Sequence, residues 1–186
     1  MTKAVFLDRD GTINKEVDVL CDLKQLKILP RAVEAIKKIN QLGYLAIIIT
    51  NQPVIARGWL TEKEVDHIHT VLISRLVKKG AKIDAVYYCP HHPNANLKKY
   101  RLKCRCRKPN IGMIQKAVKD FKINIKNSFL IGDTLKWDIK AGQKADLKTI
   151  LVKTGRTGKD TEKKIIPDFT ARNLTEAVKI IKKYGK

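Results

Sequence analysis

Several features that mark particular protein classes are scarce in this sequence of 186 residues. No apolar run comes near the roughly 20 residues that a transmembrane helix needs. Charges interrupt the N-terminal stretch after a few residues, which argues against a secretory signal peptide. Aromatic residues make up only 6%, so we expect no stacking surface for single-stranded nucleic acid. With a hydrophobic content of 44%, these absences predict a cytoplasmic globular protein, with one domain over residues 1–186.

Acidic residues are also scarce, at 18 against 39 lysines and arginines, which gives a formal net charge of +21. Such a field attracts polyanions or phosphorylated small molecules. A solvated, lysine-rich surface explains the same numbers, and the lysines form no basic tail. The charge alone therefore does not identify a partner.

The sequence has only four cysteines, and three of them gather around one histidine. Cys89, His91, Cys104 and Cys106 form the pattern C-x-H-x12-C-x-C, whereas Cys21 stands alone. In a cytosolic chain such a cluster indicates a metal site and not disulfides. Three thiolates and an imidazole would close a tetrahedral Zn2+ site, so the zinc would be structural. Two alternatives remain open, namely His92 as the imidazole ligand, or a buried Cys89 with two exposed thiols.

Short apolar runs alternate with helical patterns along the chain, which predicts an α/β fold. The expected strands cover residues 4–7, 44–50, 85–89, 128–133, 149–152 and 169–171, and the expected helices 30–43, 61–79, 111–121 and 175–183. We expect a Rossmann-like, mostly parallel sheet with helices on both faces. Residues 90–109 form a long segment without a helix or strand pattern, and loops of that length are usually functional.

Polar side chains follow three of these strands. Asp8 and Asp10 follow the first strand, Thr50 and Asn51 end the second, and Asp133 ends the fourth. Ligands bind at the carboxyl ends of parallel strands, so these groups should converge at one edge. A carboxylate cluster there suits Mg2+, which would offset the repulsion between the aspartates. The simpler alternative is an N-capping aspartate next to an Asp-Gly turn.

Two histidines lie in the helix expected at 61–79. His67 and His69 are two residues apart and cannot share a helix face. Metal-binding pairs on helices are spaced four residues apart. We therefore expect both to be ordinary helix residues.

Four short motifs carry a family resemblance. DRDGT at 8–12, TN at 50–51, RKP at 107–109 and GDTLKWD at 132–138 resemble, in order and spacing, the motifs of the haloacid dehalogenase superfamily of phosphohydrolases. The resemblance covers nearly the whole chain and is to members that have only a minimal cap. It implies a phosphoric monoester hydrolase.

The resemblance also implies roles for individual residues. Asp8 would be the nucleophile that forms an aspartyl-phosphate. Asp10 would protonate the leaving group and then activate water. Thr50 and Lys108 would hold the phosphoryl oxygens. The Mg2+ ligands would be Asp8, the backbone carbonyl of Asp10, and Asp133. Asp138 would either support the metal or cap the following helix.

The segment that carries the cysteine cluster, residues 89–109, is called the zinc loop, and it narrows the resemblance to a smaller group of phosphatases. CRCRKP, DRDGTIN and the TNQxxIARG pattern together are similar to the D,D-heptose 1,7-bisphosphate phosphatases and the related histidinol-phosphate phosphatases, and ITNQPVIARG favours the heptose branch. The resemblance implies removal of the 7-phosphate from D-glycero-D-manno-heptose 1,7-bisphosphate. Asn51, Arg107 and Lys108 would contact this small phosphorylated sugar. We expect a monomer without membrane or nucleic-acid partners.

Other functions stay open at this point. Pro53-Val54, and the segment after the first motif, depart from the usual heptose-enzyme pattern where the sugar would lie. The substrate could therefore be histidinol phosphate or another sugar phosphate. A nucleic-acid 3′-phosphatase or binding protein is a further alternative, although the zinc loop offers only Tyr100 for stacking. A catalytically inactive scaffold would not need the full set of motif residues.

Overall fold

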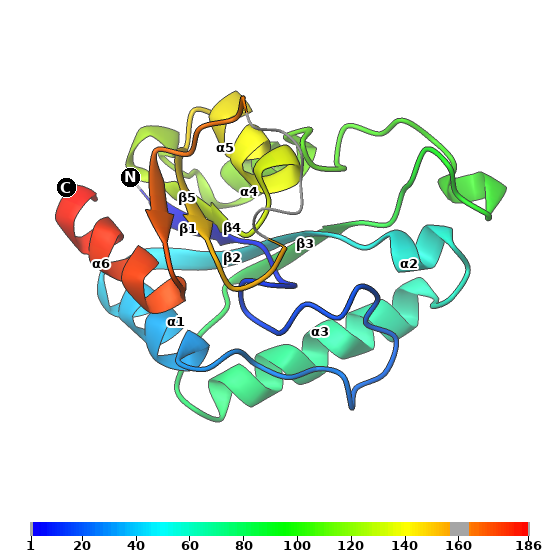
Figure 1. Cartoon of the computed structure of the whole chain (residues 1–186), viewed down its shortest axis with the longest axis horizontal. Coiled ribbons are helices and arrows are strands. Elements are labelled where there is room, and N and C mark those ends of the chain that lie inside the picture. Colours follow the sequence, from blue (N-terminus) through cyan, green and yellow to red (C-terminus); the bar gives the residue numbers. More distant parts are fainter. Residues whose placement is uncertain (1, 157–163, 186) are drawn as a thin grey trace.

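The computed structural model describes residues 2–156 and 164–185, and a parallel sheet forms its centre (Figure 1). Six strands lie in the order β3-β2-β1-β4-β5-β6, and every neighbouring pair is parallel. The strands are β1 Lys3–Leu7, β2 Tyr44–Asn51, β3 Ala85–Cys89, β4 Phe129–Gly132, β5 Lys148–Val152 and β6 Phe169–Ala171. This arrangement confirms the expected Rossmann-like sheet.

Helices cover both faces of the sheet. In Figure 1, α1, α3 and α6 lie on one side of the sheet, and α4 and α5 lie on the other. The helices are α1 Ala32–Gln41, α2 Pro53–Ala56, α3 Glu62–Val77, α4 Gly112–Phe121, α5 Lys140–Lys144 and α6 Leu174–Tyr184. Two 3-10 turns (Lys98–Tyr100 and Ile125–Asn127) and a π-helical turn (Leu135–Ile139) complete the list. None of the described helices is long and apolar enough to cross a lipid bilayer.

The alternation of side chains along β1 shows why both faces need a cover. Val5 and Leu7 pack into the apolar cluster formed with α1, α3 and α6. Ala4 and Phe6 pack into the cluster formed with α4. All four are fully buried. Successive strand residues point to opposite faces, so a strand without polar interruptions must be buried on both sides.

Most expected elements are present, with shifts of one or two residues at their ends. A capping box opens α3, because the side chains of Thr61 and Glu64 each accept a hydrogen bond from the other's backbone N–H. The expected helix at 30–43 begins later, at Ala32, because Arg31 has a left-handed backbone with φ 62°. The helices α2 and α5 were not expected, since four or five residues are too few to show a period.

The strand order has a reversal between β1 and β4. From β1 the chain proceeds to β2 and β3 on one side, whereas β4, β5 and β6 extend on the other. Ligands of such sheets bind at the carboxyl ends of the strands next to this reversal. Asp8 follows β1 directly and Asp133 follows β4, so both carboxylates lie at that point.

Candidate active site

A buried lysine joins two aspartates at the carboxyl edge of the sheet. The Nζ atom of Lys108 donates to Asp8 Oδ1 at 2.7 Å, to Asp138 Oδ1 at 2.6 Å and to the carbonyl of Ile49 at 2.9 Å. Asn51 holds the backbone of Lys108 on both sides, accepting from its N–H at 3.0 Å and donating to its carbonyl at 3.2 Å. The ammonium group is therefore held next to Asp8, the predicted nucleophile.

The charges in this group depend on one another. Burial alone would lower the pKa of Lys108, but Asp138 and Asp8 raise it above the usual value. Burial raises the pKa of Asp8 well above its ordinary range, and the neighbouring carboxylates add to this while Lys108 opposes it. The ionised form of Asp8, which a nucleophile needs, thus relies on a cation next to it.

Asp138 has more contacts than either role predicted from the sequence, support of the metal or capping of the following helix, requires. Besides its contact with Lys108, its Oδ2 accepts hydrogen bonds from the backbone N–H of Thr134 at 3.1 Å and from the Thr134 hydroxyl at 2.6 Å. It thus closes the start of the π-helical turn and orients the lysine at the same time. A Cβ at Gly132 would overlap the Asp138 carboxyl group, so glycine makes this approach possible.

Asp133 lies against two glycines at the end of β4. A Cβ on Gly11 or on Gly155 would overlap its carboxylate. Gly11 also has φ +81°, a left-handed backbone that glycine adopts without strain. Burial and the nearby Asp138 raise the pKa of Asp133 to about 7, although the backbone N–H of Arg156 donates to it at 2.6 Å.

The three carboxylates form a group that fits a hard divalent cation. Asp8, Asp133 and Asp138 each offer an oxygen, and these oxygens lie within 4.8 Å of one another. Mg2+ prefers such ligands and would offset the repulsion that raises the pKa of Asp8 and Asp133. The Asp10 side chain does not belong to this group.

The Asp10 carboxylate is held by a separate hydrogen-bond network. Its Oδ1 accepts from Arg9 Nε at 3.1 Å and Asn14 at 2.8 Å, and its Oδ2 from Arg9 Nη2 at 2.7 Å and Gln52 at 3.1 Å. Gln52 also donates to the Thr50 hydroxyl at 2.9 Å. Burial would raise the pKa of Asp10, but the Arg9 charge and these hydrogen bonds lower it.

His69 completes this network, although the sequence did not place it in the site. The Arg9 side chain is only 1% exposed, and its Nη1 lies 3.0 Å from His69 Nε2. Burial and the Arg9 charge lower the pKa of His69 to about 3, so the ring is neutral and accepts the hydrogen bond. One signal could have found it, because position 69 falls on the buried stripe of α3 that includes Ile68 and Leu72.

The His69 pKa leads to a testable pH dependence of stability. The unfolded chain protonates this imidazole near pH 6.5, whereas the folded chain does not until about pH 3. His69 therefore lowers the free energy of unfolding as pH falls through that window. Urea unfolding should show a smaller loss between pH 7 and pH 4 for His69→Gln than for the wild type. Exposed His67, mutated to Gln, is the control, and an unchanged slope in His69→Gln would contradict the assignment.

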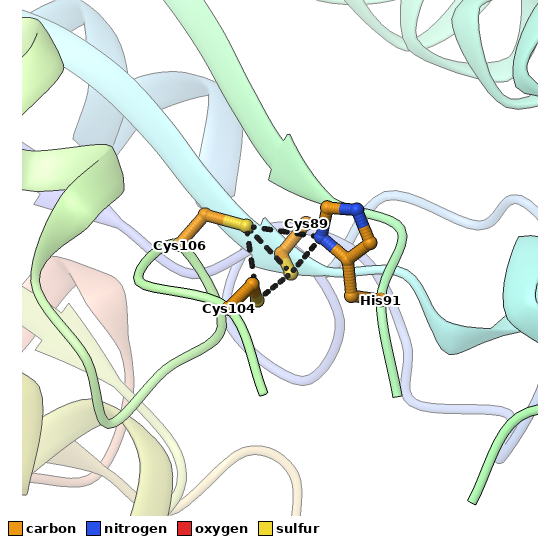
Figure 2. A group of neighbouring side chains, drawn as sticks. All are labelled: Cys89, His91, Cys104 and Cys106. Carbon is orange, nitrogen blue, oxygen red and sulfur yellow. Dashed lines mark hydrogen bonds between the residues drawn. The ribbon is translucent and has the colours of Figure 1, made fainter. Parts of the chain in front are cut away.

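The four predicted zinc ligands come together at the end of β3 (Figure 2). Cys89 Sγ lies 3.0 Å from Cys106 Sγ and 3.4 Å from Cys104 Sγ, and His91 Nδ1 lies 3.4 Å from Cys106 Sγ. His92 lies outside the group, and its Nδ1 accepts from the backbone of Asn94. Three sulfurs and one nitrogen gathered in one place are the donor set of a structural tetrahedral Zn2+ site.

The cluster also anchors the chain that leads to Lys108. Hydrogen-bond contacts with the side chains of Cys89, Cys104 and His91 lower the pKa of Cys106 to about 5, which favours the thiolate that metals bind. The backbone N–H of Arg107 donates to Cys104 Sγ at 3.2 Å, and its side chain donates to the His91 carbonyl at 3.2 Å. The cluster thus fixes the residue directly before the buried lysine.

All of the residues that the sequence assigned to the phosphate site line one cavity of about 420 Å³. They are Asp8, Asp10, Thr50, Asn51, Arg107, Lys108 and Asp133. The segment from Glu16 to Leu20 forms one wall, and Val54, Arg57 and Trp137 line other parts. The cavity is thus acidic at its base and is also lined by four arginines, Arg9, Arg57, Arg107 and Arg156, an arrangement suited to a metal and an anionic ligand.

Comparison with known proteins supports this assignment. A family model described as HAD-hydrolase-like matches residues 105–177. A D-glycero-alpha-D-manno-heptose-1,7-bisphosphate 7-phosphatase from Photorhabdus laumondii is 42% identical, over 94% of this chain and 97% of the relative. A D-glycero-beta-D-manno-heptose-1,7-bisphosphate 7-phosphatase from Pasteurella multocida is 36% identical, over 98% of each chain.

A solved structure agrees with these relatives. The D,D-heptose 1,7-bisphosphate phosphatase from B. bronchiseptica, crystallised with magnesium and phosphate, superposes with a TM-score of 0.86 at 26% identity, over 98% of this chain and 99% of that one. Sequence and fold therefore agree over nearly the full length. The chain belongs to the heptose-1,7-bisphosphate 7-phosphatase family of haloacid dehalogenase-like hydrolases, which are phosphoric monoester hydrolases.

Proposed function

We propose that this protein is a Mg2+-dependent phosphatase that removes the 7-phosphate from D-glycero-D-manno-heptose 1,7-bisphosphate. The observation that carries the proposal is the buried Asp8–Lys108–Asp138 group at the base of the cavity, in a chain that matches heptose bisphosphatases over almost its whole length. The ammonium provides positive charge where phosphoryl oxygens would lie, and Asp8 provides an oxygen nucleophile beside it.

The first half-reaction follows from these positions. An oxygen of the Asp8 carboxylate attacks phosphorus, the bond between phosphorus and the C7 oxygen breaks, and an aspartyl-phosphate forms. Asp10 gives a proton to the departing C7 oxygen, which leaves as the sugar hydroxyl. Thr50 and Lys108 hold the phosphoryl oxygens while the charge redistributes.

The second half-reaction restores the enzyme. Asp10, now ionised, accepts a proton from water, and the water oxygen attacks phosphorus. The bond between Asp8 and phosphorus breaks, which releases inorganic phosphate. The hydrogen bonds from Arg9, Asn14 and Gln52 hold the Asp10 carboxylate in place for these two proton transfers.

The proposed Mg2+ ligands are Asp8, the backbone carbonyl of Asp10, and Asp133. When bound, the ion neutralises the negative charge of the phosphoryl group and of the aspartates. The raised pKa of Asp133 supports this role, because its burial among carboxylates favours the protonated form until a cation is present.

The walls of the cavity support a substrate with a second phosphate. Arg107 and Arg57 both line the cavity. A phosphate at the far end of a sugar would meet these guanidinium groups, and bidentate contacts with phosphate are what arginine provides. Asn51 acts through Lys108, whose backbone it holds.

The test is phosphate release with Mg2+ from a panel of substrates. It holds both anomers of the heptose 1,7-bisphosphate, histidinol phosphate, fructose 1,6-bisphosphate and a 3′-phosphorylated oligonucleotide. We expect one heptose anomer to give the highest kcat/KM, and the two anomers matter because the relatives include enzymes named for each. A higher kcat/KM for histidinol phosphate or the oligonucleotide would contradict the proposal. A steep loss of activity with salt would indicate nucleic-acid binding.

We further propose that the cysteine cluster holds structural Zn2+. Cys104→Ser should reduce the zinc content of the pure protein and lower its melting temperature, because structural zinc contributes directly to folding free energy. Metal analysis and thermal unfolding measure the two effects. Cys21→Ser is the matched control, since Cys21 is exposed and outside the cluster. Wild-type protein without zinc after purification would contradict this assignment.

We propose that the enzyme works as a single-domain monomer in the cytoplasm. Residues of one chain supply every predicted contact to the phosphate, and reduced thiols such as those of the cluster persist in that compartment. Sedimentation of the purified protein at assay concentration tests the monomer directly, and a dimer would overturn it.

A further inference from the structure

Two consecutive residues of the zinc loop meet two consecutive residues of the π-helical turn. Lys108 pairs with Asp138 at 2.6 Å, and the guanidinium carbon of Arg107 lies 5.4 Å from the ring centre of Trp137. The Lys108–Asp138 pair is buried and belongs to the phosphate site described above. The Arg107–Trp137 pair lies on the wall of the same cavity.

The Lys108–Asp138 pair lies directly beside the Arg107–Trp137 pair on the same two chain segments. Hydrogen bonds fix both oxygens of Asp138: Thr134 donates to Oδ2, and Lys108 donates to Oδ1. The turn Leu135–Ile139 is wider than an α-helix, and turns of this kind occur frequently at functional sites. Trp137 directly precedes Asp138 on this turn, and its half-buried indole lies against Arg107.

Arg107 is held from two directions. Its Nη1 donates to the His91 carbonyl at 3.2 Å, which ties the guanidinium to the zinc cluster. The indole of Trp137 contacts it from the other chain segment. Tryptophan is the best aromatic partner for a cation, and the interaction strengthens when water is excluded. The Nζ atom of Lys136 also lies 5.0 Å from the centre of the Trp137 ring, so this indole contacts two cations.

We propose that Trp137 is a positioning residue that holds Arg107 over the cavity and thereby sets the preference for a substrate with a second phosphate. The inference rests on the proposed function, because it assigns Arg107 to the phosphate that is not hydrolysed. Asp8 and Lys108 act on the reacting phosphoryl group, so loss of Trp137 should weaken binding of the distant phosphate and leave the chemical step in place.

The first test distinguishes effects on binding of the distant phosphate from effects on the reacting phosphate. For Trp137→Ala we expect kcat/KM for the heptose bisphosphate to fall about tenfold, mainly through KM. Activity on p-nitrophenyl phosphate, which has no second phosphate, should change less than about twofold. Trp137→Phe should restore most of the loss, since it keeps an aromatic face. Equal losses on both substrates would overturn the proposal, because Trp137 would then act on the phosphate site or on folding.

A double-mutant cycle shows whether Trp137 acts through Arg107. If it does, Trp137→Ala combined with Arg107→Met should lose no more than Arg107→Met alone. Additive losses would overturn the positioning role, because the indole would then contact the substrate independently.

A last measurement needs no substrate, so it distinguishes failure of this inference from failure of the proposed function. The chain has two tryptophans, and Trp59→Phe leaves Trp137 as the only one. In that background, Arg107→Met should shift the intensity or maximum of the Trp137 emission, whereas Arg101→Met, on the same loop, should not. Unchanged emission would overturn the contact itself. Failure of the proposed function would instead show as a wild-type enzyme that does not prefer the heptose bisphosphate.

Discussion

Asp8→Asn is expected to lower phosphate release by about 10⁴-fold or more, because the amide has no anionic oxygen with which to attack phosphorus. The geometry of the site should survive, since Asn has nearly the same shape and Lys108 retains Asp138 and the Ile49 carbonyl as partners. Phosphate release with Mg2+ measures the loss, and far-UV circular dichroism checks the fold.

The matched control replaces a carboxylate that is exposed and outside the cavity. Asp120 lies on α4 and pairs with Lys116 on the surface. Asp120→Asn should therefore keep wild-type turnover. If Asp8→Asn retained even a few per cent of wild-type activity with folding intact, Asp8 would not be the nucleophile.

Lys108→Met should damage both activity and stability. The substitution leaves Asp8 and Asp138 buried without their shared cation, and breaking such a group costs about 3–5 kcal/mol of unfolding free energy. The lost charge on the phosphoryl oxygens should lower kcat by about 10²–10³-fold. Urea unfolding and steady-state kinetics measure the two effects, with exposed Lys126→Met as the control.

The stability loss should also depend on pH in a defined direction. Without Lys108, burial and mutual repulsion raise the pKa of Asp8 further in the folded state. The folded variant then binds protons that the unfolded chain releases, so its free energy of unfolding rises as pH falls from neutral toward 5. The gap to the wild type should therefore narrow at low pH. A gap that stays constant would show that the loss has another cause, such as packing.

The site residues that could be predicted from the sequence are marked by patterns in their own neighbouring residues. Asp8 and Asp133 each end an apolar strand, and parallel strands bring such ends together by geometry alone. The cysteine pattern likewise predicts its own cluster, although the choice of His91 over His92 required the path of the loop. These features need no knowledge of how distant side chains pack.

The remaining contacts join positions far apart in the chain. Arg9 and His69 are 60 residues apart, and Lys108 is 30 residues from Asp138. Nothing in either local sequence states that the two will meet, because the meeting depends on how α3 and the zinc loop pack on the sheet. Trp137 was overlooked for a different reason, since a five-residue π-helical turn leaves no periodic pattern to read.

The close approach of glycines to the acidic groups has a consequence for how the gene tolerates mutation. Asp133 lies against Gly11 and Gly155, and Asp138 lies against Gly132, with no room for even one methyl group. In a survey of every single substitution, alanine at these glycines should be as damaging as loss of the charges themselves. The intolerant positions would then come as sets, an aspartate with the glycines beside it, and residues without any reactive atom would mark the active site as clearly as the reactive ones.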